Sequence, residues 1–389
     1  MLSTATTLPI DRERALLVGR AFVPAVYGAV LVAVRGDDLV DATAVAPTSS
    51  MLMNLDDPAA AIRDARSLPP IARLDDVLAN SDEERRDAGK PWLLAPNDLQ
   101  AIKAAGVTFV ASMLERVIEE QARGDPAKAE SVRRAIVAVI GDNLSNVRPG
   151  SPEAARLKDA LIAQKAWSQY LEVGIGPDAE IFTKSQPMSA VGTGAAIGIH
   201  PKSEWNNPEP EIVLVVNARG RTVGATLGND VNLRDFEGRS ALLLGKAKDN
   251  NASCAIGPFV RLFDEHYTID DVRTCDLAMR VEGTDGFVLD GASAIGMISR
   301  DPLDLVSQAI GPNHQYPDGL VLFLGTMFAP TKDRLGPGQG FTHVVGDVVS
   351  VSTPKLGTLQ NRVDTSDKIA PWTLGAGELM RSLARRGVL

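Results

Sequence analysis

The sequence predicts an α+β fold, with a small N-terminal domain over residues 1–95 and a larger, β-rich domain over residues 96–389. Two observations lead to this prediction. From about residue 171, glycine and proline become dense and short apolar runs alternate with turns, as in IVLVVN and GLVLFLG, which is typical of many short strands. Before that point, residues 99–170 contain three segments with helical character.

The N-terminal domain is expected to combine short strands with interrupted helices. Apolar residues at 26–34 alternate with polar breaks, which favours strands. Pro69-Pro70 interrupts the stretch of residues 51–92, which is rich in Asp, Arg and Ala. A connector at residues 93–100 marks the boundary between the two domains.

Next, residues 99–123 are expected to form a helix after an entry strand or turn. Two more helices are expected over 127–147 and 151–170, so the segment 124–170 should be largely helical. The third of them begins with Ser-Pro-Glu at 151–153, which supplies an N-cap and a proline at the first helical position. Further helices are expected at 301–309 and 376–386.

Composition excludes several classes of protein. The 389 residues carry a formal net charge of −9, which argues against nucleic acid as the main partner. The apolar runs are far too short to span a membrane, and the N-terminus has no long apolar segment of the secretory type. Two cysteines, Cys254 and Cys275, are too few for a disulfide framework. We expect a cytoplasmic enzyme.

Three carboxylates are expected to meet at one end of a hairpin. Glu209 and Glu211 lie two apart before an apolar strand, so their side chains share a face. The turn Asn-Ala-Arg-Gly at 217–220 returns the chain, which places the partner of Glu209 near Gly228 and Asn229, beside Asp230.

Such a cluster repels itself unless a cation holds it. Oxygen ligands without histidine or cysteine favour Mg²⁺, Mn²⁺ or Ca²⁺ over zinc or copper. From the residues alone, however, Glu209 and Glu211 fit a solvated strand start equally well.

Two further segments carry polar groups of interest. A lysine beside a dication has its ammonium form disfavoured, so Lys248 can act as a base near neutral pH, although an exposed surface lysine is the commoner case. Gly325-Thr326 ends a buried strand and offers an N–H and a hydroxyl to an anionic ligand, or forms an ordinary turn.

In order and spacing, these motifs resemble the fumarylacetoacetate hydrolase superfamily. The resemblance covers most of residues 171–355 and rests on F-T-K (182–184), E-P-E (209–211), N-D-V-N-x-R-D (229–235), A-K (247–248) before C-A-I-G-P (254–258), and a late G-T (325–326). Within the superfamily, LLAPNDLQAIKAAGVTF (93–109), WNNPEPE (205–211) and KAKDNNASCAIGPF (246–259) resemble the bacterial 2-keto-3-deoxy-D-xylonate (D-arabinonate) dehydratases.

The resemblance implies a mixed β-roll catalytic domain of fumarylacetoacetate hydrolase type after a small N-terminal α+β domain. It also implies a divalent metal, usually Mg²⁺, on Glu209, Glu211 and Asp230, and a homodimer or larger homo-oligomer. Lys248, Arg234, Gly325 and Thr326 match substrate-site positions.

One motif departs from the family pattern. Hydrolytic members carry a His-Glu pair that activates water, in a segment that matches residues 106–115 here. Glu115 is retained, but Ser112 stands in place of the histidine, and serine cannot take a proton from water near neutral pH as imidazole does. We expect Ser112 to contact the substrate instead.

The predicted activity is therefore the dehydration of a 2-keto-3-deoxy-pentonate to 2-oxoglutarate semialdehyde. We expect Lys248 to take a C3 proton and leave an enolate on the oxygen that the metal holds. Glu115 is expected to protonate the departing C4 hydroxyl, while Arg234 and Thr326 hold the carboxylate and keto oxygens. The alternatives are a C–C hydrolase or decarboxylase of acylpyruvate-like diketo acids, and a non-catalytic protein that binds sugar acids.

Overall fold

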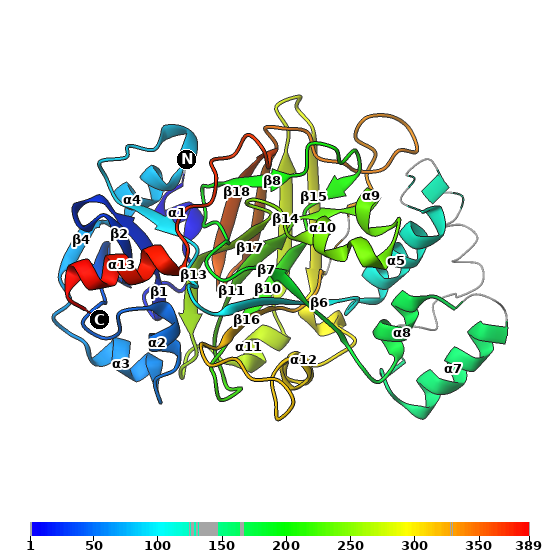
Figure 1. Cartoon of the computed structure of the whole chain (residues 1–389), viewed down its shortest axis with the longest axis horizontal. Coiled ribbons are helices and arrows are strands. Elements are labelled where there is room, and N and C mark those ends of the chain that lie inside the picture. Colours follow the sequence, from blue (N-terminus) through cyan, green and yellow to red (C-terminus); the bar gives the residue numbers. More distant parts are fainter. Residues whose placement is uncertain are drawn as a thin grey trace.

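Two β-sheets form the middle of the protein, with the N-terminal strands at one end and a group of helices at the other (Figure 1). The computed structural model describes residues 2–123, 125, 128, 129, 131, 147–163, 167–326, 328 and 330–388. Both sheets are mixed: β16 pairs with β6 and β18 with β8 in parallel, whereas neighbours such as β10 and β11 are antiparallel. The predicted α+β class is confirmed.

The larger sheet has eleven strands among the described residues, in the order β4-β3-β2-β1-β13-β11-β10-β16-β6-β7, with β5 paired to β1. Its strands are β1 (Leu17–Val23), β2 (Gly28–Arg35), β3 (Asp38–Asp41), β4 (Pro70–Arg73), β5 (Trp92–Leu94), β6 (Ala101–Gly106), β7 (Glu180–Ser185), β10 (Pro210–Val216), β11 (Thr222–Asp230), β13 (Cys254–Leu262) and β16 (Leu320–Phe323).

The second sheet has the order β15-β14-β17-β18-β8 and packs against the first. Its strands are β8 (Ala196–Ile199), β14 (Asp276–Glu282), β15 (Val288–Ala294), β17 (Val348–Thr353) and β18 (Gly357–Thr365), and a separate pair joins β9 (Asn206–Asn207) to β12 (Asn232–Leu233).

Strand β10 is buried on both faces, which explains its unbroken apolar run. Ile212 and Leu214 belong to the core between the two sheets, whereas Val213 and Val215 pack in a second core with Leu52 of α2 (Ser49–Met53) and Ile62 of α3 (Pro58–Asp64). A strand covered on both faces needs no polar alternation. Strand β10, which begins beside Glu209, is therefore fixed by packing on both of its faces.

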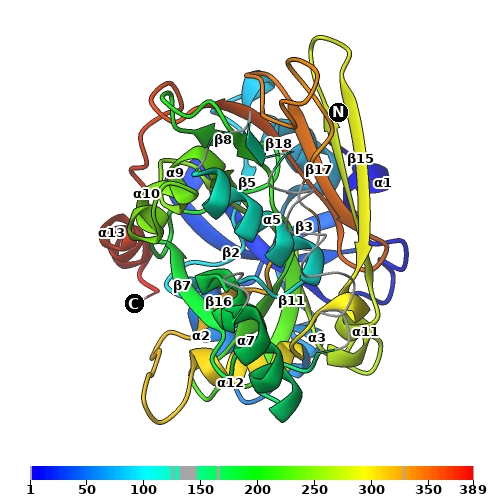
Figure 2. The ribbon, with the colours of Figure 1, turned by 90° about the vertical axis from the view of Figure 1, so that its right-hand side faces the viewer.

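Helices α5 (Val110–Ala122), α7 (Pro152–Ala163) and α8 (Gln169–Ile175) share a small apolar core at the end of the molecule away from the N-terminal strands (Figure 2). The remaining helices are α1 (Thr4–Thr7), α4 (Leu74–Ser81), α9 (Arg234–Glu237), α10 (Leu244–Lys248), α11 (Ile269–Arg273), α12 (Pro302–Ala309) and α13 (Ala376–Arg386).

Some of the expected helices differ from the observed ones. Over 99–123, the expected entry strand is β6 (Ala101–Gly106), between β16 and β7, and the helix expected after it is α5, which begins at Val110. The helix expected over 151–170 is two helices, α7 and α8. Most of the helix expected over 127–147 lies outside the described residues. The expected helices at 301–309 and 376–386 are present as α12 and α13.

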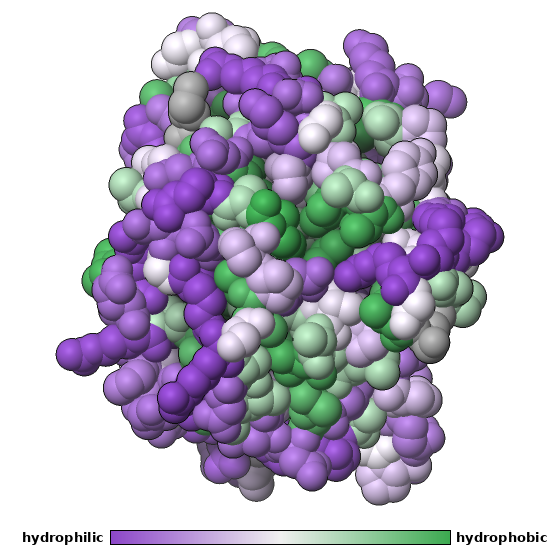
Figure 3. All heavy atoms as spheres, turned by 90° about the vertical axis from the view of Figure 1, so that its left-hand side faces the viewer, coloured by the Kyte–Doolittle hydropathy of each residue, from purple (hydrophilic) through white to green (hydrophobic). Residues whose placement is uncertain are grey.

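The N-terminal strands and the central strands share one sheet, because β1 pairs with β13. Helix α13 returns to this end, where Arg386 donates to the hydroxyl of Thr43 (2.7 Å). Hydrogen bonds therefore connect the two predicted domains, and the division of the chain at residue 95 stays a prediction. The face on this side carries hydrophobic side chains in its middle, between hydrophilic ones (Figure 3). No helix in the described ranges combines the length and apolar character needed to cross a bilayer.

Candidate active site and metal centre

The hairpin of β10 and β11 brings Glu209, Glu211 and Asp230 together. Its register pairs Pro210 with Asn229, and the N–H of Asp230 donates to the carbonyl of Glu209 (3.0 Å). One carboxylate oxygen from each of the three acids lies within 4.8 Å of the others, and all three side chains are buried. The strand register thus brings three carboxylate groups together, as the spacing predicts, and the group could hold a metal ion.

Two buried lysines neutralise part of this acid triad. Nζ of Lys248, at the end of α10, lies 2.5 Å from Oε2 of Glu209 and 3.1 Å from Oδ2 of Asp230. Nζ of Lys184, on β7, lies 3.0 Å from Oδ1 of Asp230 and also donates to the backbone carbonyl of Lys248. Lys184 therefore fixes both Asp230 and the segment that carries Lys248.

A third cation reaches the triad from helix α5. Arg116 is buried and forms an ion pair with Glu209, while its Nη1 lies 2.8 Å from Glu119 and 2.8 Å from Glu237. Nε of Arg234 lies 3.1 Å from the other oxygen of Glu119. The triad is thus one part of a buried network that links α5, α9 and the hairpin.

Electrostatics make this network suitable for a divalent cation. Although burial opposes the shift, Arg116 and Lys248 lower the pKa of Glu209 to about 2. Burial, followed by the charges of Asp230 and Glu209, raises the pKa of Glu211 well above its usual value. Burial likewise opposes ionisation of Lys248, but Asp230 and Glu209 outweigh it and raise its pKa. Carboxylates crowded in this way are a natural site for a hard cation.

The other wall of the site is the end of β16. Gly325 donates its N–H to Oε2 of Glu211 (2.7 Å) at a φ of +94°, where a side chain would be strained. A Cβ at this position would lie 2.0 Å from the hydroxyl of Thr108. Thr326 lines a small cavity beside the acid triad, and its hydroxyl donates to the carbonyl of Phe328 (3.1 Å). The glycine is therefore required both by the backbone and by the close approach.

Glu180 is a site residue that the sequence analysis missed. It stands at the start of β7 and lines the triad cavity, of about 10 Å³, together with Lys248 and Arg116. It also lines an adjoining cavity of about 110 Å³, which is bounded by Tyr170 and Leu244. Burial, followed by the charge of Glu237, raises the pKa of Glu180 to about 7. A carboxyl group with that pKa can donate and accept protons near neutral pH.

Gly106 makes room for this carboxyl group. It pairs with Glu180 across β6 and β7, and a Cβ on it would lie 1.9 Å from Oε2 of Glu180. The sequence feature that could have indicated Glu180 is therefore Gly106. It is informative only once β6 and β7 are known to pair.

The structure separates some of the predicted site residues from the triad. Arg234 is buried behind Glu119, donates to the carbonyl of Pro330 (3.2 Å), and is not among the residues that line the triad cavity. Glu115 is half-buried on α5, and it too is absent from that lining, which includes Arg116 instead. The side chain of Ser112 lies outside the described residues.

Comparison with known proteins identifies the family. The family described as "Fumarylacetoacetate (FAA) hydrolase C-terminal" matches residues 159–364, which is more than half of the chain. The chain belongs to the fumarylacetoacetate hydrolase family. The predicted resemblance is therefore confirmed.

Two curated members of the family are similar to the chain. A "Probable 2-keto-3-deoxyxylonate dehydratase" from Haloferax volcanii is 34% identical over 290 residues, which cover 74% of this chain and 91% of the relative. A "2-dehydro-3-deoxy-D-arabinonate dehydratase" from Saccharolobus solfataricus is 30% identical over 190 residues, which cover 49% and 60%. Both relatives are named as dehydratases, the enzyme class that the sequence predicts.

Solved structures of the family share the fold. A 2-keto-3-deoxy-D-arabinonate dehydratase "complexed with magnesium and 2,5-dioxopentanoate" aligns over 90% of this chain and 99% of its own, with a TM-score of 0.61 at 20% identity. The predicted mixed sheets of fumarylacetoacetate hydrolase type are therefore confirmed.

Proposed function

We propose that the chain is a Mg²⁺-dependent dehydratase of 2-keto-3-deoxy-pentonates of the D-xylonate or D-arabinonate type, and that its product is 2-oxoglutarate semialdehyde. The observation that supports this most is the buried triad of Glu209, Glu211 and Asp230, in a chain 34% identical to a probable 2-keto-3-deoxyxylonate dehydratase. A solved protein of the same fold binds magnesium together with 2,5-dioxopentanoate, which is the same compound as the proposed product.

The charge balance supports a divalent cation. The network joins six carboxylates (Glu119, Glu180, Glu209, Glu211, Asp230 and Glu237) to four cations (Arg116, Lys184, Arg234 and Lys248). Its formal charge is −2 when every group is ionised, the charge that one divalent cation balances. Oxygen ligands alone favour Mg²⁺ over zinc. When bound, the cation would polarise the 2-oxo acid and draw the charge of Glu209 and Asp230 away from Lys248.

Lys248 and Glu180 then move the protons. Lys248 takes a proton from C3, and the electron pair of that bond forms the C3–C4 double bond as the C4–O bond breaks. Glu180 gives its proton to the departing hydroxyl, which leaves as water. The Glu180 carboxylate next takes a proton from C5, and Lys248 returns its proton to C3. The resulting C5 enol tautomerises to the aldehyde, and both side chains regain their starting state.

Other residues position the substrate. We propose that Arg116 and Thr326, which line the cavity, hold the carboxylate and keto oxygens. Arg234 becomes a positioning residue, because it holds Glu119, which in turn holds Arg116. Glu180 replaces Glu115 as the proposed acid, because Glu180 lines both cavities.

Product analysis tests the proposal. The chain is incubated with D- and L-forms of 2-keto-3-deoxy-pentonates, with and without EDTA, and the products are identified by mass spectrometry. We expect one five-carbon product that has lost one water, no turnover in EDTA, and recovery with Mg²⁺. Two carbon fragments would indicate a hydrolase, release of CO₂ would indicate a decarboxylase, and binding without turnover would indicate a non-catalytic protein; each would reject the proposal.

The role of Lys248 has a separate test. In deuterated water, Lys248→Ala should lose exchange of the C3 hydrogens while it still binds Mg²⁺. Lys246→Ala is the matched control, because Lys246 is an exposed lysine on the same helix. Unchanged exchange in Lys248→Ala would remove this residue from its role as the base.

A further inference from the structure

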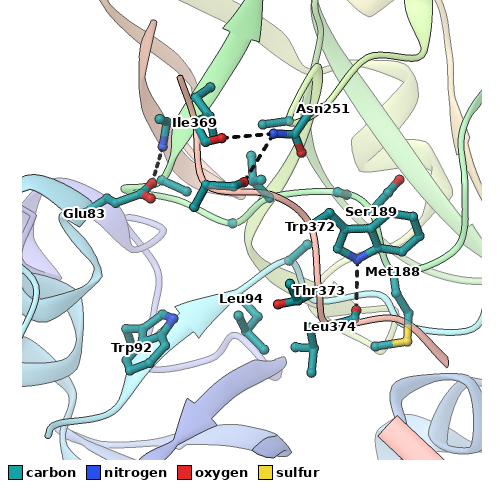
Figure 4. Close-up of a pocket in the computed structure, with 18 of the residues that line it drawn as sticks. Glu83, Trp92, Leu94, Met188, Ser189, Asn251, Ile369, Trp372, Thr373 and Leu374 are labelled. Carbon is teal, nitrogen blue, oxygen red and sulfur yellow. Dashed lines mark hydrogen bonds between the residues drawn. The ribbon is translucent and has the colours of Figure 1, made fainter. Parts of the chain in front are cut away.

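A third cavity lies between the N-terminal strands, the central sheet and the C-terminal segment (Figure 4). It has a volume of about 340 Å³, and residues 92–95, 188–192, 251–252 and 369–374 form most of its wall. None of the described residues lines both this cavity and the triad cavity. Its volume is in the range of small-molecule pockets, so it is a separate candidate for ligand binding.

Most of the wall is apolar and includes two indole rings. Trp92 and Trp372 lie on opposite sides of the pocket, with Leu94 and Leu374 between them (Figure 4). The indole N–H of Trp372 donates to the carbonyl of Leu374 (3.0 Å), which holds the ring in place although it is 47% exposed. Flat apolar walls of this kind fit the ring or aliphatic body of a small molecule.

Arg20 brings a buried positive charge to this wall. Its Nη1 donates to the carbonyls of Ala95 (3.3 Å) and Asn97 (2.5 Å), but its Nη2 is buried and has no acceptor among the described residues. Asp98 lies 3.8 Å from Nε and already accepts three backbone N–H groups. The guanidinium is therefore only partly neutralised, and one of its donors is left over.

Arg86 adds a second guanidinium with a donor to spare. Its guanidinium lies 5.0 Å from the centre of the Trp92 ring, and its Nη2 donates to the carbonyl of Ser81 (3.0 Å). Its Nε is buried without an acceptor in the described part of the chain. Glu83, the acid among the lining residues, already accepts the N–H of Ala196 (2.7 Å). Two cations and one acid thus line the cavity.

We infer that this cavity binds a small organic acid, whose carboxylate accepts N–H groups of Arg20 and Arg86 and whose apolar body packs between Trp92 and Trp372. A carboxylate supplies the charge-assisted acceptors that both guanidinium groups lack. Burial lowers the pKa of both arginines, and a bound anion would offset that cost. This inference does not rest on the proposed function, because it involves neither the acid triad nor a 2-oxo acid.

The probe for the test is 2-naphthoate, with 2-naphthamide as its neutral counterpart. Both are titrated into the full-length chain in EDTA, without a 2-oxo acid, and followed by calorimetry. Trp92 and Trp372 are two of the four tryptophans, so intrinsic fluorescence gives a second signal. We expect one saturable site for the acid and at least tenfold weaker binding of the amide.

Variants locate the site. We expect Arg86→Met and Trp372→Ala each to weaken 2-naphthoate binding at least fivefold. Arg381→Met, an exposed arginine elsewhere, and Glu211→Gln, in the acid triad, should leave the dissociation constant within twofold. Because Trp372 lies on an exposed segment, its variant remains informative if Arg86→Met does not fold.

Three results would overturn the inference. Equal affinity for 2-naphthoate and 2-naphthamide would mean that the cavity does not prefer a negatively charged ligand. Unchanged binding in Trp372→Ala would place the probe elsewhere on the chain. Loss of binding in Glu211→Gln would place it in the acidic network.

Discussion

Replacing Glu180 by glutamine should stabilise the folded protein and abolish its activity. The pKa of Glu180 is raised from 4.5 to about 7, first by burial and then by Glu237. A carboxyl with a raised pKa in the folded state binds its proton more tightly there than in the unfolded chain. The contribution of Glu180 to stability is therefore fully present below pH 4.5 and is lost as the pH rises through 7. Over that interval the cost is about 3 kcal/mol.

Glutamine keeps the shape of this side chain but never ionises, so the variant escapes that cost. In EDTA, Glu180→Gln should therefore exceed the parent protein in unfolding free energy by about 3 kcal/mol at pH 8.5, and by less than about 1 kcal/mol at pH 5. With Mg²⁺ and substrate, its kcat should fall by about 10²–10⁴, the usual contribution of a positioned acid.

Urea denaturation at the two pH values and steady-state kinetics give the two measurements. Glu13→Gln is the matched control, because Glu13 is an exposed glutamate that pairs with Arg12 outside the network, and its kcat should stay close to that of the parent. A gain in Glu180→Gln that does not grow between pH 5 and pH 8.5 would refute the raised pKa. A kcat close to that of the parent would refute the proposed acid.

Three other substitutions test the surroundings of the site. Lys184→Met should lower the unfolding free energy in EDTA by about 1–3 kcal/mol, because it removes one of the two lysines that pair with the buried Asp230. Mg²⁺ should restore part of the loss in a thermal melt, and a melt insensitive to Mg²⁺ would count against the metal site. Gly106→Ala should displace Glu180, lower the unfolding free energy by about 1–3 kcal/mol and lower kcat. The double variant with Glu180→Gln should have the same kcat as Glu180→Gln alone, and a lower value would mean that the two residues act independently. Glu211→Gln should weaken Mg²⁺ binding more than 100-fold by calorimetry. It should also raise the melting temperature in EDTA, because it removes a carboxylate whose ionised form is disfavoured by burial and by its neighbours. Unchanged Mg²⁺ affinity would exclude Glu211 as a ligand.

The acid triad could be predicted from sequence because all of its information is local. Glu209 and Asp230 are joined by one hairpin, and a turn signal with strand periodicity was enough to bring them together. The structure pairs Pro210 with Asn229, within a residue of the expected register. Because side chains alternate between the two faces of a strand, the position of the turn fixes the pairing register to within about one residue.

The surrounding charges could not be predicted because they come from distant elements. Helix α5 carries glutamates at 115, 119 and 120, and only the packing of the helix decides that Glu119, rather than Glu115, meets Arg116 and Arg234. Glu180 depends on the pairing of β6 with β7, and the sequence did not show which strand lies beside β7. The stretch AIKAAG has helical propensity, but pairing with β16 and β7 overrides it.

The formal charge of −2 in the buried network ties metal content to acidity. In the absence of a cation, protons can fill part of the same deficit, and the raised pKa of Glu211 locates one of them on this carboxyl group. Loading the dication would then expel that proton, so the apparent affinity for the metal would change by up to about tenfold for each pH step of one. An acidic buffer should remove the bound cation, and a mildly alkaline buffer that contains Mg²⁺ should restore it. The metal content of a preparation would therefore depend on the pH of the last buffer used.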